Sequence, residues 1–512
     1  MKGTKENNEK LTAADTVLNP NANAAEPAQE DISEILRVRR EKLQALTEKG
    51  QNPFVKVKYP KTHNSVQIIE NYAALENAQV SVAGRIISKR IMGKASFAHV
   101  LDGEGTIQLY VKLDNVDNYD DFKAYDIGDI IGCRGEVFKT HAGEVSVKVS
   151  SIELLAKSLL PLPEKFHGLK DQELKYRQRY VDLISSPEVK RTFVTRSKII
   201  SEIRRYLDNL GFLEVETPIL SPLASGANAR PFVTRHNALD IEMYLRVAPE
   251  LYLKRLIVGG FEKVYEIGRN FRNEGMDVRH NPEFTMLELY QAYVDYHAMM
   301  DLSEGIYCHV ADKVIGSRQI SYEGEIIDLD NWHKLSMTQA VKRYLGVDFE
   351  TLDDKGAVKA AKDLGVELQE RHNTWGYALY ETFDQKVESQ LIQPTFIYDY
   401  PVEVSPLAKK KPADGRLTER FEFFISAREM GNAFSELNDP IDQQARFMEQ
   451  AKQKAKGDDE SMMTDDDYVN ALSYGLAPTG GLGIGLDRMI MLFTDSHSIR
   501  DVLLFPTMKP NK

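Results

Sequence analysis

FRNEGMDVRHNPEF, at residues 271–284, joins two strand-like runs, Lys263–Ile267 and Phe284–Ala292. This connection does not have the composition of a plain linker, because it gathers arginines, acids, a histidine and a terminal phenylalanine. A polyphosphate nucleotide needs such groups, since a guanidinium forks onto phosphate oxygens and an aromatic ring offers a face to adenine. The stretch therefore predicts either a nucleotide site between two strands or an ordinary salt-bridged hairpin.

A second signal is TGGLGIGLDR, at residues 479–488. Closely spaced glycines let the backbone approach a ligand, and Arg488 opens the helix that follows, so phosphate is the expected ligand. The run fails as a dinucleotide-binding fingerprint, because Arg488 takes the third glycine position and too little chain follows for a βαβ unit. The nearest P-loop match, residues 92–95, lacks the upstream glycine and the Ser/Thr. If ATP binds, it binds in another way.

A third signal is a set of glutamates seven residues apart, Glu422, Glu429 and Glu436. On a helix the three would share one face, and if the chain turned midway they could converge on one cavity. Carboxylates in a nucleotide site would hold Mg²⁺, a hard cation that takes oxygen ligands and bridges phosphates. The alternative is a solvated acidic helix face.

Length and composition limit the class of protein. The chain has 512 residues, of which 42% are hydrophobic and 28% charged, so we expect two to four folded units and exclude a fibre. A net charge of −12 argues against a protein that coats nucleic acid everywhere, although Glu34–Lys61 is locally basic. That basic stretch is either a nucleic-acid contact or a solvated helix face. Two cysteines, no signal peptide and no membrane-length apolar run predict a soluble, cytoplasmic protein without a membrane partner.

The N-terminal third changes character along its length. Residues 1–30 have the composition of a disordered arm, and 31–64 are predicted as an N-terminal helix, Ile32–Lys49, with a lead-in. Five short β-branched runs within 65–160 predict an OB-fold β-barrel, with any other small barrel as the alternative. On two of these runs four side chains alternate and could share a base-stacking face. They are Phe97, His99, Gln108 and Tyr110.

The remainder reads as a linker and a larger domain. Residues 161–183 are predicted to be the linker, and 184–512 to be an α+β domain, because strands and helices mix there without a βαβ period. An amphipathic helix is expected over Val194–Gly211, followed by a strand at Phe212–Thr217. A helical insertion is expected at about 345–392.

In their order, these signals resemble motifs of the class II aminoacyl-tRNA synthetases. Motif 1 is the stretch before Pro218, motif 2 is 271–284 and motif 3 is 479–488. Segments ARPF at 229–232, APELYLK at 248–254 and 431–439 are similar to bacterial-type lysyl-tRNA synthetases, and the resemblance covers 31–512. It implies an anticodon-binding OB-fold, a catalytic domain of antiparallel sheet flanked by helices, and a homodimer formed through motif 1.

The resemblance also implies a reaction and its partners. ATP and L-lysine would give lysyl-adenylate and pyrophosphate, and lysine would pass to the 3′-terminal adenosine of tRNA(Lys), with Mg²⁺ as cofactor. No protein nucleophile is needed, because the carboxylate of lysine is already ionised. The enzyme must align that carboxylate with the α-phosphate and stabilise charge on the phosphoryl oxygens. Arg272 and Arg488 are the catalytic residues that the resemblance implies.

Family positions imply further roles, residue by residue. The ATP-binding residues would be Arg272, Glu274, His280, Asn281, Phe284 and Arg488, with Glu422 and Glu429 as magnesium ligands. The lysine-binding residues would be Gly226, Glu250, Glu288, Tyr290, Asn432, Phe434 and Glu436. The anticodon would be read by Phe97, Gln108 and Glu144, with Arg85 and Arg90 near its phosphates. Glu436 and Tyr290 are expected at the ε-ammonium of lysine, since a desolvated cation needs a carboxylate.

Three other functions compete with this one. An aspartyl- or asparaginyl-type class II synthetase would need a cation or amide partners in the pocket, where this chain offers Glu436 beside Phe434. A relative that transfers lysine to a protein would lack the N-terminal barrel. A non-enzymatic OB-type nucleic-acid binder would leave the three signals unexplained.

Overall fold

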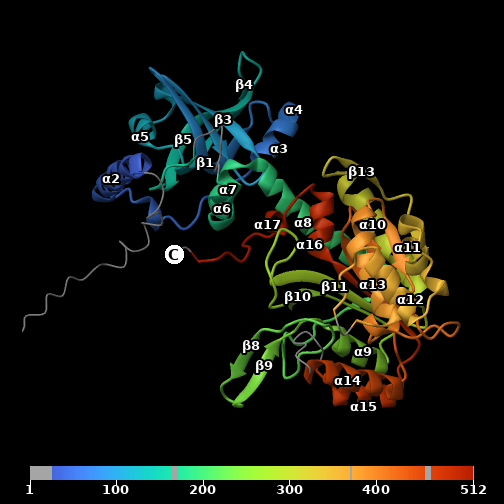
Figure 1. Ribbon diagram of the computed structural model, residues 1–512. Coiled ribbons are helices and arrows are strands. Elements are labelled where there is room, and N and C mark those ends of the chain that lie inside the picture. Colours follow the sequence, from blue (N-terminus) through green and yellow to red (C-terminus); the bar gives the residue numbers. More distant parts are fainter. Residues whose placement is uncertain (1–25, 164–170, 370–371, 456–462, 511–512) are drawn as a thin grey trace, which may run out of the picture. The chain divides into compact units, whose positions relative to one another are not determined.

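The computed structural model describes residues 26–163, 171–369, 372–455 and 463–510 (Figure 1). It divides into two compact units, Met1–Gly168 and Leu169–Lys512. The disordered arm expected over residues 1–30 lies outside the described residues as far as residue 25. From Glu26 onward the expectation is wrong, because helix α2 covers Glu26–Glu48. Within the described ranges, no helix is both long and apolar enough to cross a membrane.

The N-terminal unit is a closed barrel with the strand order β1-β2-β3-β5-β4, which confirms the OB-fold prediction. Buried and half-buried residues alternate along β2 and β3, so one side of each strand fills the barrel core. The strands are β1 (Gln79–Met92), β2 (Ala95–Leu101), β3 (Thr106–Lys112), β4 (Ile130–Lys139) and β5 (Val145–Ala156). The short helices are η1 (Pro53–Val55), α3 (Ser65–Glu70), α4 (Tyr72–Leu75), η2 (Leu113–Asn115) and α5 (Tyr119–Ala124).

Two buried cations tie this unit together. Arg39 of α2 donates hydrogen bonds to the backbone oxygens of Ser158, Leu160 and Ile127, which fixes the helix against the barrel. Lys157, with a side chain only 1% exposed, lies 2.9 Å from the buried carboxylate of Asp129. Each buried charge therefore has partners, as a folded interior requires.

The C-terminal unit is built on an eight-stranded sheet with the order β14-β15-β16-β17-β18-β11-β10-β6. The central pairs are antiparallel and the pairs at both edges, β14–β15 and β10–β6, are parallel. This is the predicted α+β class. The strands are β6 (Leu213–Glu214), β10 (Lys263–Phe271), β11 (Glu283–Ala292), β14 (His333–Ser336), β15 (Thr395–Tyr398), β16 (Arg420–Phe424), β17 (Glu429–Ser435) and β18 (Thr479–Gly485).

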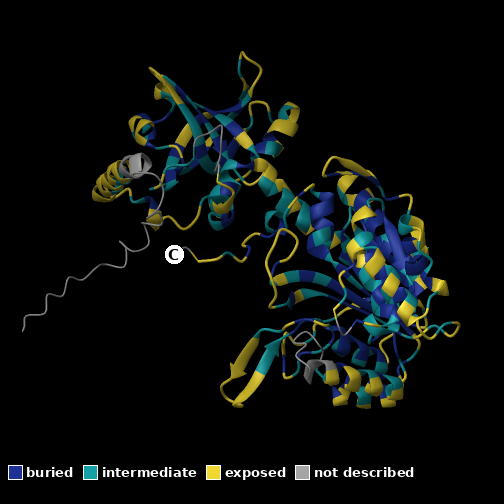
Figure 2. Cartoon of the chain, in the orientation of Figure 1, coloured by how far each residue is buried: buried dark blue, intermediate teal, exposed yellow. Residues whose placement is uncertain are grey.

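Helices cover both faces of this sheet (Figure 1). On one face, α8, α10 and α16 form the largest core with the sheet, and Figure 2 shows α16 almost wholly in dark blue. On the other face, α9, α14 and α15 pack beside a cavity. These helices are α8 (Pro187–Asn209), α9 (Glu250–Val258), α10 (Tyr296–Val310), α14 (Pro440–Ala455), α15 (Asp466–Ser473) and α16 (Leu486–Phe493). The chain also contains α6 (Gln172–Arg177), α7 (Arg179–Ser185), η3 (Ala311–Ile315), η6 (Val402–Val404) and α17 (Ile499–Val502).

The segment in which a helical insertion was predicted, at about 345–392, forms its own small core. It contains α11 (Met337–Leu345), η4 (Phe349–Thr351), α12 (Asp354–Asp363), α13 (Trp375–Lys386) and η5 (Glu388–Gln390). Trp375, Phe349 and Phe383 are buried there, and the indole of Trp375 donates to the Phe349 carbonyl. Two further small sheets are β12 (Gln319–Tyr322) with β13 (Glu325–Asp328), and β7 (Leu220–Ser221), β9 (Ile241–Leu245) and β8 (Val233–His236).

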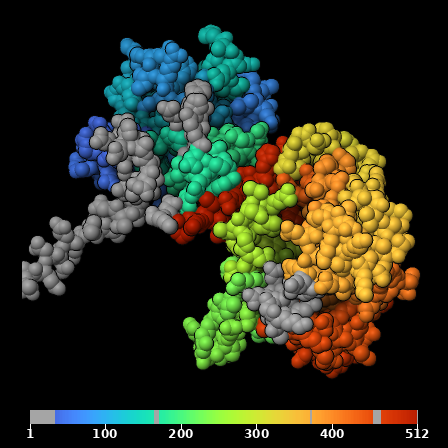
Figure 3. Space-filling model, viewed as in Figure 1, coloured from blue at the N-terminus to red at the C-terminus, as the bar shows by residue number. Residues whose placement is uncertain are grey.

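The predicted motif 1 segment differs from expectation in its lengths. Helix α8 begins at Pro187 instead of Val194 and ends before Gly211, whose φ of 80° is left-handed. The strand expected at Phe212–Thr217 is reduced to Leu213–Glu214, because only two of its residues pair with β10. The nearby hairpin β8–β9 projects from its unit in Figure 3 and carries exposed apolar side chains, among them Val233 and Leu239.

Candidate active site and nucleic-acid face

Four neighbouring strands build the candidate site, because every second side chain along each strand points to the cavity. Leu287 and Leu289 of β11 point into the core, whereas Glu288 and Tyr290 line the cavity on the opposite face. Strands β16, β17 and β18 alternate in the same way, with apolar residues in the core and polar residues or glycine at the cavity. One strand-to-strand row reads Glu288, Gly483, Asn432 and Glu422, and the next reads Tyr290, Gly481, Phe434 and Arg420.

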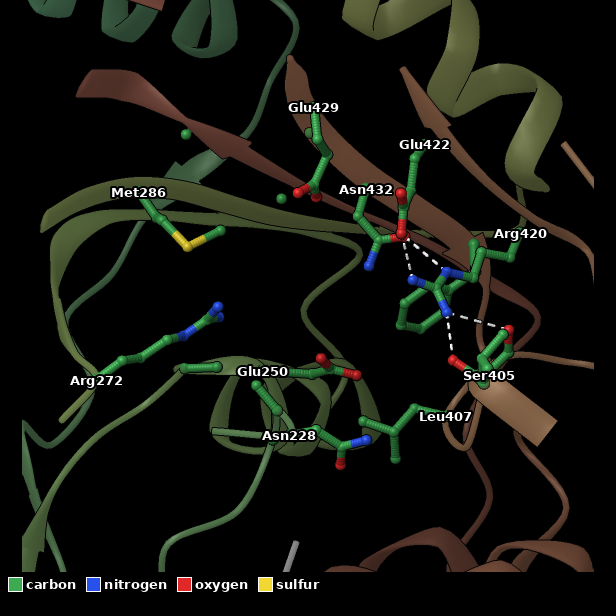
Figure 4. A pocket seen from close by; sticks show the side chains of 18 of the residues that line it. Asn228, Glu250, Arg272, Met286, Ser405, Leu407, Arg420, Glu422, Glu429 and Asn432 are labelled. Carbon is green, nitrogen blue, oxygen red and sulfur yellow. Dashed lines mark hydrogen bonds and ion pairs between the residues drawn. The ribbon is translucent and has the colours of Figure 1, made fainter. Parts of the chain in front are cut away.

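The cavity has a volume of about 710 Å³. Its wall includes every residue that the resemblance assigned to ATP, magnesium or lysine, although they come from segments far apart in the chain (Figure 4). These are Gly226, Glu250, Arg272, Glu274, His280, Asn281, Phe284, Glu288, Tyr290, Glu422, Glu429, Asn432, Phe434, Glu436 and Arg488. A space of this size holds a nucleotide and a small amino acid together.

One end of the cavity is closed and acidic. The side chain of Glu436, just after β17, is fully buried, and its Oε1 atom makes no hydrogen bond within the described residues. Glu436 has room because residue 481 is glycine, since a Cβ atom there would collide with this carboxylate and with the Tyr290 ring. Burial raises the pKa of Glu436 well above its usual value, while the ammonium of Lys254 acts to lower it. This end is suited to receive a cation.

A second acid lies deeper in the same wall. Glu288 is 5% exposed, and burial, with the negative charge of Glu250, raises its pKa to about 8. The Tyr290 hydroxyl is likewise held in its neutral form, because burial and the neighbouring carboxylates raise its pKa. The pocket therefore combines a neutral phenol with several acids at neutral pH.

The other end of the cavity is cationic and aromatic. The guanidinium of Arg272 lies 5.2 Å from the centre of the Phe284 ring, and its Nε atom has no hydrogen-bond partner among the described residues. Figure 4 shows the Arg272 side chain reaching into the open space near Met286. Arg488, in the first turn of α16, lies 3.2 Å from the Nε2 atom of His280 and donates to the Glu429 carbonyl. The unpaired guanidinium donor of Arg272 and an arginine in the first turn of a helix fit phosphate.

The remaining loop residues are arranged by local hydrogen bonds. Asp277 accepts from the backbone and from Nδ1 of His280, which shapes the connection between β10 and β11. Asn281 is buried and its amide donates to the Glu283 carbonyl. Glu274 is exposed at the cavity rim. The connection is thus a structured loop that joins the antiparallel strands β10 and β11.

The helical arrangement considered for the three glutamates is wrong. Glu422 lies on β16 and Glu429 begins β17, and the chain turns between them at Ser426 and Ala427, both of which have positive φ. Glu436 lies at the opposite end of β17. Burial raises the pKa of Glu422 to about 7, Arg420 lowers it and the negative charge of Glu429 raises it again. Among the described residues no cluster of three or more side chains could hold a metal ion by itself.

Sequence reasoning missed several residues of this wall. Arg420 is half-buried in the site and donates to Asn432 Oδ1, Glu422 and Ser405 Oγ (Figure 4). It aligns the two strands whose acids face the cavity. The signal was its place immediately before the apolar run 421–424, where period-two alternation puts residues 420 and 422 on one face. Lys254, at the end of the APELYLK segment, was also overlooked.

On the barrel, the four side chains that were predicted to share one face lie on neighbouring strands. Phe97 pairs with Tyr110 and His99 with Gln108 across β2 and β3, and the two aromatic rings lie 5.2 Å apart. Glu144 joins them, because its carboxylate accepts from Gln108 Nε2 at 2.6 Å and lies 2.9 Å from His99 Nε2. A carboxylate, an amide and half-buried rings on one barrel face can stack and hydrogen-bond bases.

The two arginines that are expected near the anticodon phosphates, Arg85 and Arg90, differ in solvent exposure. Arg85 is half-buried and donates to the Gly128 carbonyl at 2.7 Å, and burial lowers its pKa. Arg90 is exposed near the end of β1. Arg90 is therefore the more accessible of the two.

Comparison with known proteins gives the class and then the family. A family model described as tRNA synthetases class II (D, K and N) matches residues 171–509, and one described as an OB-fold nucleic acid binding domain matches residues 80–155. Since the first covers more than half of the chain, the protein belongs to the class II tRNA synthetases. Similar proteins narrow this further to the lysine–tRNA ligase family within that class.

Three of these relatives show the extent of the similarity. The lysine–tRNA ligase of Thermoanaerobacter sp. strain X514 is 58% identical over 94% of this chain and 97% of its own length. That of Pelotomaculum thermopropionicum is 56% identical over 94% of this chain and 96% of its own. That of Carboxydothermus hydrogenoformans is 56% identical over 94% and 99%. The three competing functions considered from the sequence are therefore excluded, since the similarity to lysine–tRNA ligases spans both the barrel and the catalytic domain.

Proposed function

We propose that this chain activates L-lysine with ATP, forming lysyl-adenylate and pyrophosphate, and then transfers lysine to the 3′-terminal adenosine of tRNA(Lys). The observation that carries this proposal is the closed acidic end of the cavity, where the buried Glu436 Oε1 atom has no hydrogen bond among the described residues. A long side chain ending in an ammonium ion matches that end in charge. A substrate with a carboxylate side chain, as in an aspartate enzyme, would be repelled there.

The first step needs alignment and charge stabilisation. A carboxylate oxygen of lysine attacks the α-phosphorus, a new P–O bond forms, and the bond to the β-phosphate oxygen breaks to release pyrophosphate. We assign Arg272 to the charge that develops on the α-phosphoryl oxygens, because its donors open into the cavity. Phe284 would stack on adenine, and Glu274, His280, Asn281 and Arg488 would hold the rest of the nucleotide.

The amino acid would be held by the opposite wall. Glu436, Tyr290 and Phe434 would surround the ε-ammonium group, and Glu250 with the backbone near Gly226 would take the α-amino group. Asn432 and Glu288 would complete the pocket. In the second step a ribose hydroxyl of tRNA attacks the activated carbonyl carbon, and AMP leaves.

We further propose Mg²⁺ as the cofactor at Glu422 and Glu429. The fit rests on the chemistry of the donors, because Glu429 raises the pKa of its neighbour Glu422, as two carboxylates lacking a shared cation would do. When bound, the ion would neutralise phosphate charge. Arg420 and Tyr400 would hold the Glu422 carboxylate in place, since both donate hydrogen bonds to it.

The barrel face would read the anticodon through Phe97, Gln108 and Glu144. We also propose a cytoplasmic homodimer formed through the motif 1 segment, where Val194, Leu210 and Leu213 are exposed apolar side chains that a second copy would cover. Sedimentation equilibrium tests the dimer directly, and a monomer at micromolar concentration would contradict it.

The decisive experiment is pyrophosphate exchange into ATP with each of the twenty amino acids, without tRNA. Exchange with lysine alone is the expected result. Exchange with a different amino acid would overturn the pocket assignment, and no exchange with any of them would overturn the activation step.

A further inference from the structure

A lysine of the protein itself lies directly behind the wall of the proposed lysine pocket. Lys254 follows Glu250 by one turn of α9, and its side chain is 0% exposed. Its Nζ atom forms ion pairs with both Glu250 and Glu436, two of the acids that line the cavity. Lys254 does not line the cavity itself. It therefore contacts the two carboxylates from behind.

The surroundings of Lys254 duplicate those proposed for the substrate. Its Nζ atom lies 5.3 Å from the centre of the Phe434 ring and 5.9 Å from that of Tyr290. A third ring, Tyr468 of α15, lies 5.9 Å away on the side remote from the sheet strands. Aromatic faces and carboxylates together stabilise a desolvated cation. Two ammonium groups would thus share one set of partners when lysine is bound.

The carboxylate oxygens are divided between the two sides. Glu250 uses Oε1 for Lys254, and Glu436 uses Oε2. The Oε1 atom of Glu436 has no hydrogen bond within the described part of the chain, and glycine at 481 leaves it space at the cavity. A carboxylate has about four acceptor sites, so one oxygen can serve Lys254 while the other serves a ligand.

The charge balance requires the buried cation. Burial acts to lower the pKa of Lys254, but Glu250 and Glu436 hold it above its usual value, so the group stays charged. Without it, two buried carboxylates would lie close together with no cation between them, which costs free energy as long as both are charged. The other titratable and charged groups that face this cluster are Glu288 and Tyr290 from β11, Tyr468 from α15, Arg255 from α9, and, around Glu288, Arg246, Glu266 and Arg272.

We propose that Lys254 is a positioning residue for substrate specificity: its two ion pairs fix the carboxylates of Glu250 and Glu436 in the wall of the cavity and leave the Oε1 atom of Glu436 for the ammonium group of lysine. This inference rests on the proposed activation of lysine. The competing reading is that Lys254 stands in for the substrate and must be displaced. The two readings predict opposite signs, because removing a competitor tightens lysine binding and removing a support weakens it.

The test is Lys254→Met, which keeps the length of the side chain and removes its charge. We expect its Kd for lysine, measured by calorimetry without ATP, and its KM for lysine in pyrophosphate exchange to rise on the order of 10- to 100-fold. The KM for ATP should change less than about threefold, since the nucleotide end is remote from Lys254. The KM for lysine should fall as pH rises in both proteins, and in Lys254→Met this fall should be shifted to higher pH, because the ammonium of Lys254 acts to lower the pKa of Glu436.

The matched control is Lys157→Met, which removes a buried lysine paired with Asp126 and Asp129 in the barrel unit. It should lower the melting temperature to a similar extent and leave lysine activation unchanged. Lys254→Ala with added ethylammonium should recover part of the lost lysine affinity, which a structural defect would not. Tighter lysine binding by Lys254→Met, or an equal loss for lysine and ATP with the pH profile of the wild type, would overturn the inference. Failure of the wild type to exchange with lysine would instead overturn the proposed function.

Discussion

Two glutamates, each beside aromatic rings on a sheet, show how environment changes what one residue type can do. Glu436 in the cavity has a fully buried side chain paired with a buried lysine, whereas Glu144 on the barrel is 47% exposed and hydrogen-bonded to His99 and Gln108. Water screens the second and not the first. A buried acid recognises its ligand by charge, so its contribution to the binding free energy is large and depends strongly on pH. An exposed acid recognises its ligand by the direction of its hydrogen bonds and contributes less binding free energy.

The largest expected effect tests the buried half of this contrast. Glu436→Gln keeps the shape of the side chain and removes its charge, so lysine activation should fall on the order of 1,000-fold in pyrophosphate exchange. Glu325→Gln, on the small sheet β12–β13, is the control and should exchange normally. Unchanged lysine kinetics in Glu436→Gln would remove the residue from this role.

A second prediction concerns pH and the other buried acid. Burial raises the pKa of Glu288 in the folded chain to about 8, whereas the usual pKa of a glutamate is 4.5, so folding takes up a proton between these values. The free energy of unfolding is therefore lost as pH rises through this window, with a ceiling of about 1.4 kcal/mol per pH unit for this group. Glu288→Gln lacks this loss. Its stability relative to wild type should increase from pH 5 to pH 8 in urea denaturation, and a pH-independent difference would show that Glu288 is ionised.

Space is the third property that separates the two glutamates. Gly481→Ala places a methyl group against the Glu436 carboxylate and the Tyr290 ring, so kcat/KM for lysine should fall by about 10- to 100-fold. Gly415→Ala is the matched control, because no atom lies within 4 Å of a Cβ atom there. Equal kinetics in Gly481→Ala and Gly415→Ala would mean that the cavity wall accommodates the added methyl group without displacing Glu436.

The smallest effect belongs to the exposed half. Phe97→Ala removes one stacking surface, so KM for tRNA in lysine charging should rise about tenfold. Pyrophosphate exchange, which needs no tRNA, should be unchanged. An equal loss in both assays would indicate that Phe97 supports the fold of the barrel.

The fold was predictable from sequence to the extent that local patterns carry it. Alternation located the barrel strands and placed Phe97 and Gln108 on one face, and the charged connection 271–284 was found between the correct strands. The spacing of Glu422, Glu429 and Glu436 did not reveal the hairpin, because a period of seven suits a helix and the turn at 426–427 has no glycine or proline to announce it. Lys254 was missed because its partner Glu436 lies far along the chain. Such a pairing depends on sheet order, which local patterns do not encode.

Strand β18 passes through the middle of the catalytic sheet with glycine at positions 481, 483 and 485, on its cavity side. Because glycine has no side chain, any replacement there can only reduce the volume of the cavity. A variant that accepts an amino acid bulkier than lysine therefore cannot be obtained along this strand. The useful positions for such engineering are on the walls, where Leu407 and Met286 can be shortened. Strand β18 therefore limits the size of the amino acid that variants of this enzyme can be made to accept.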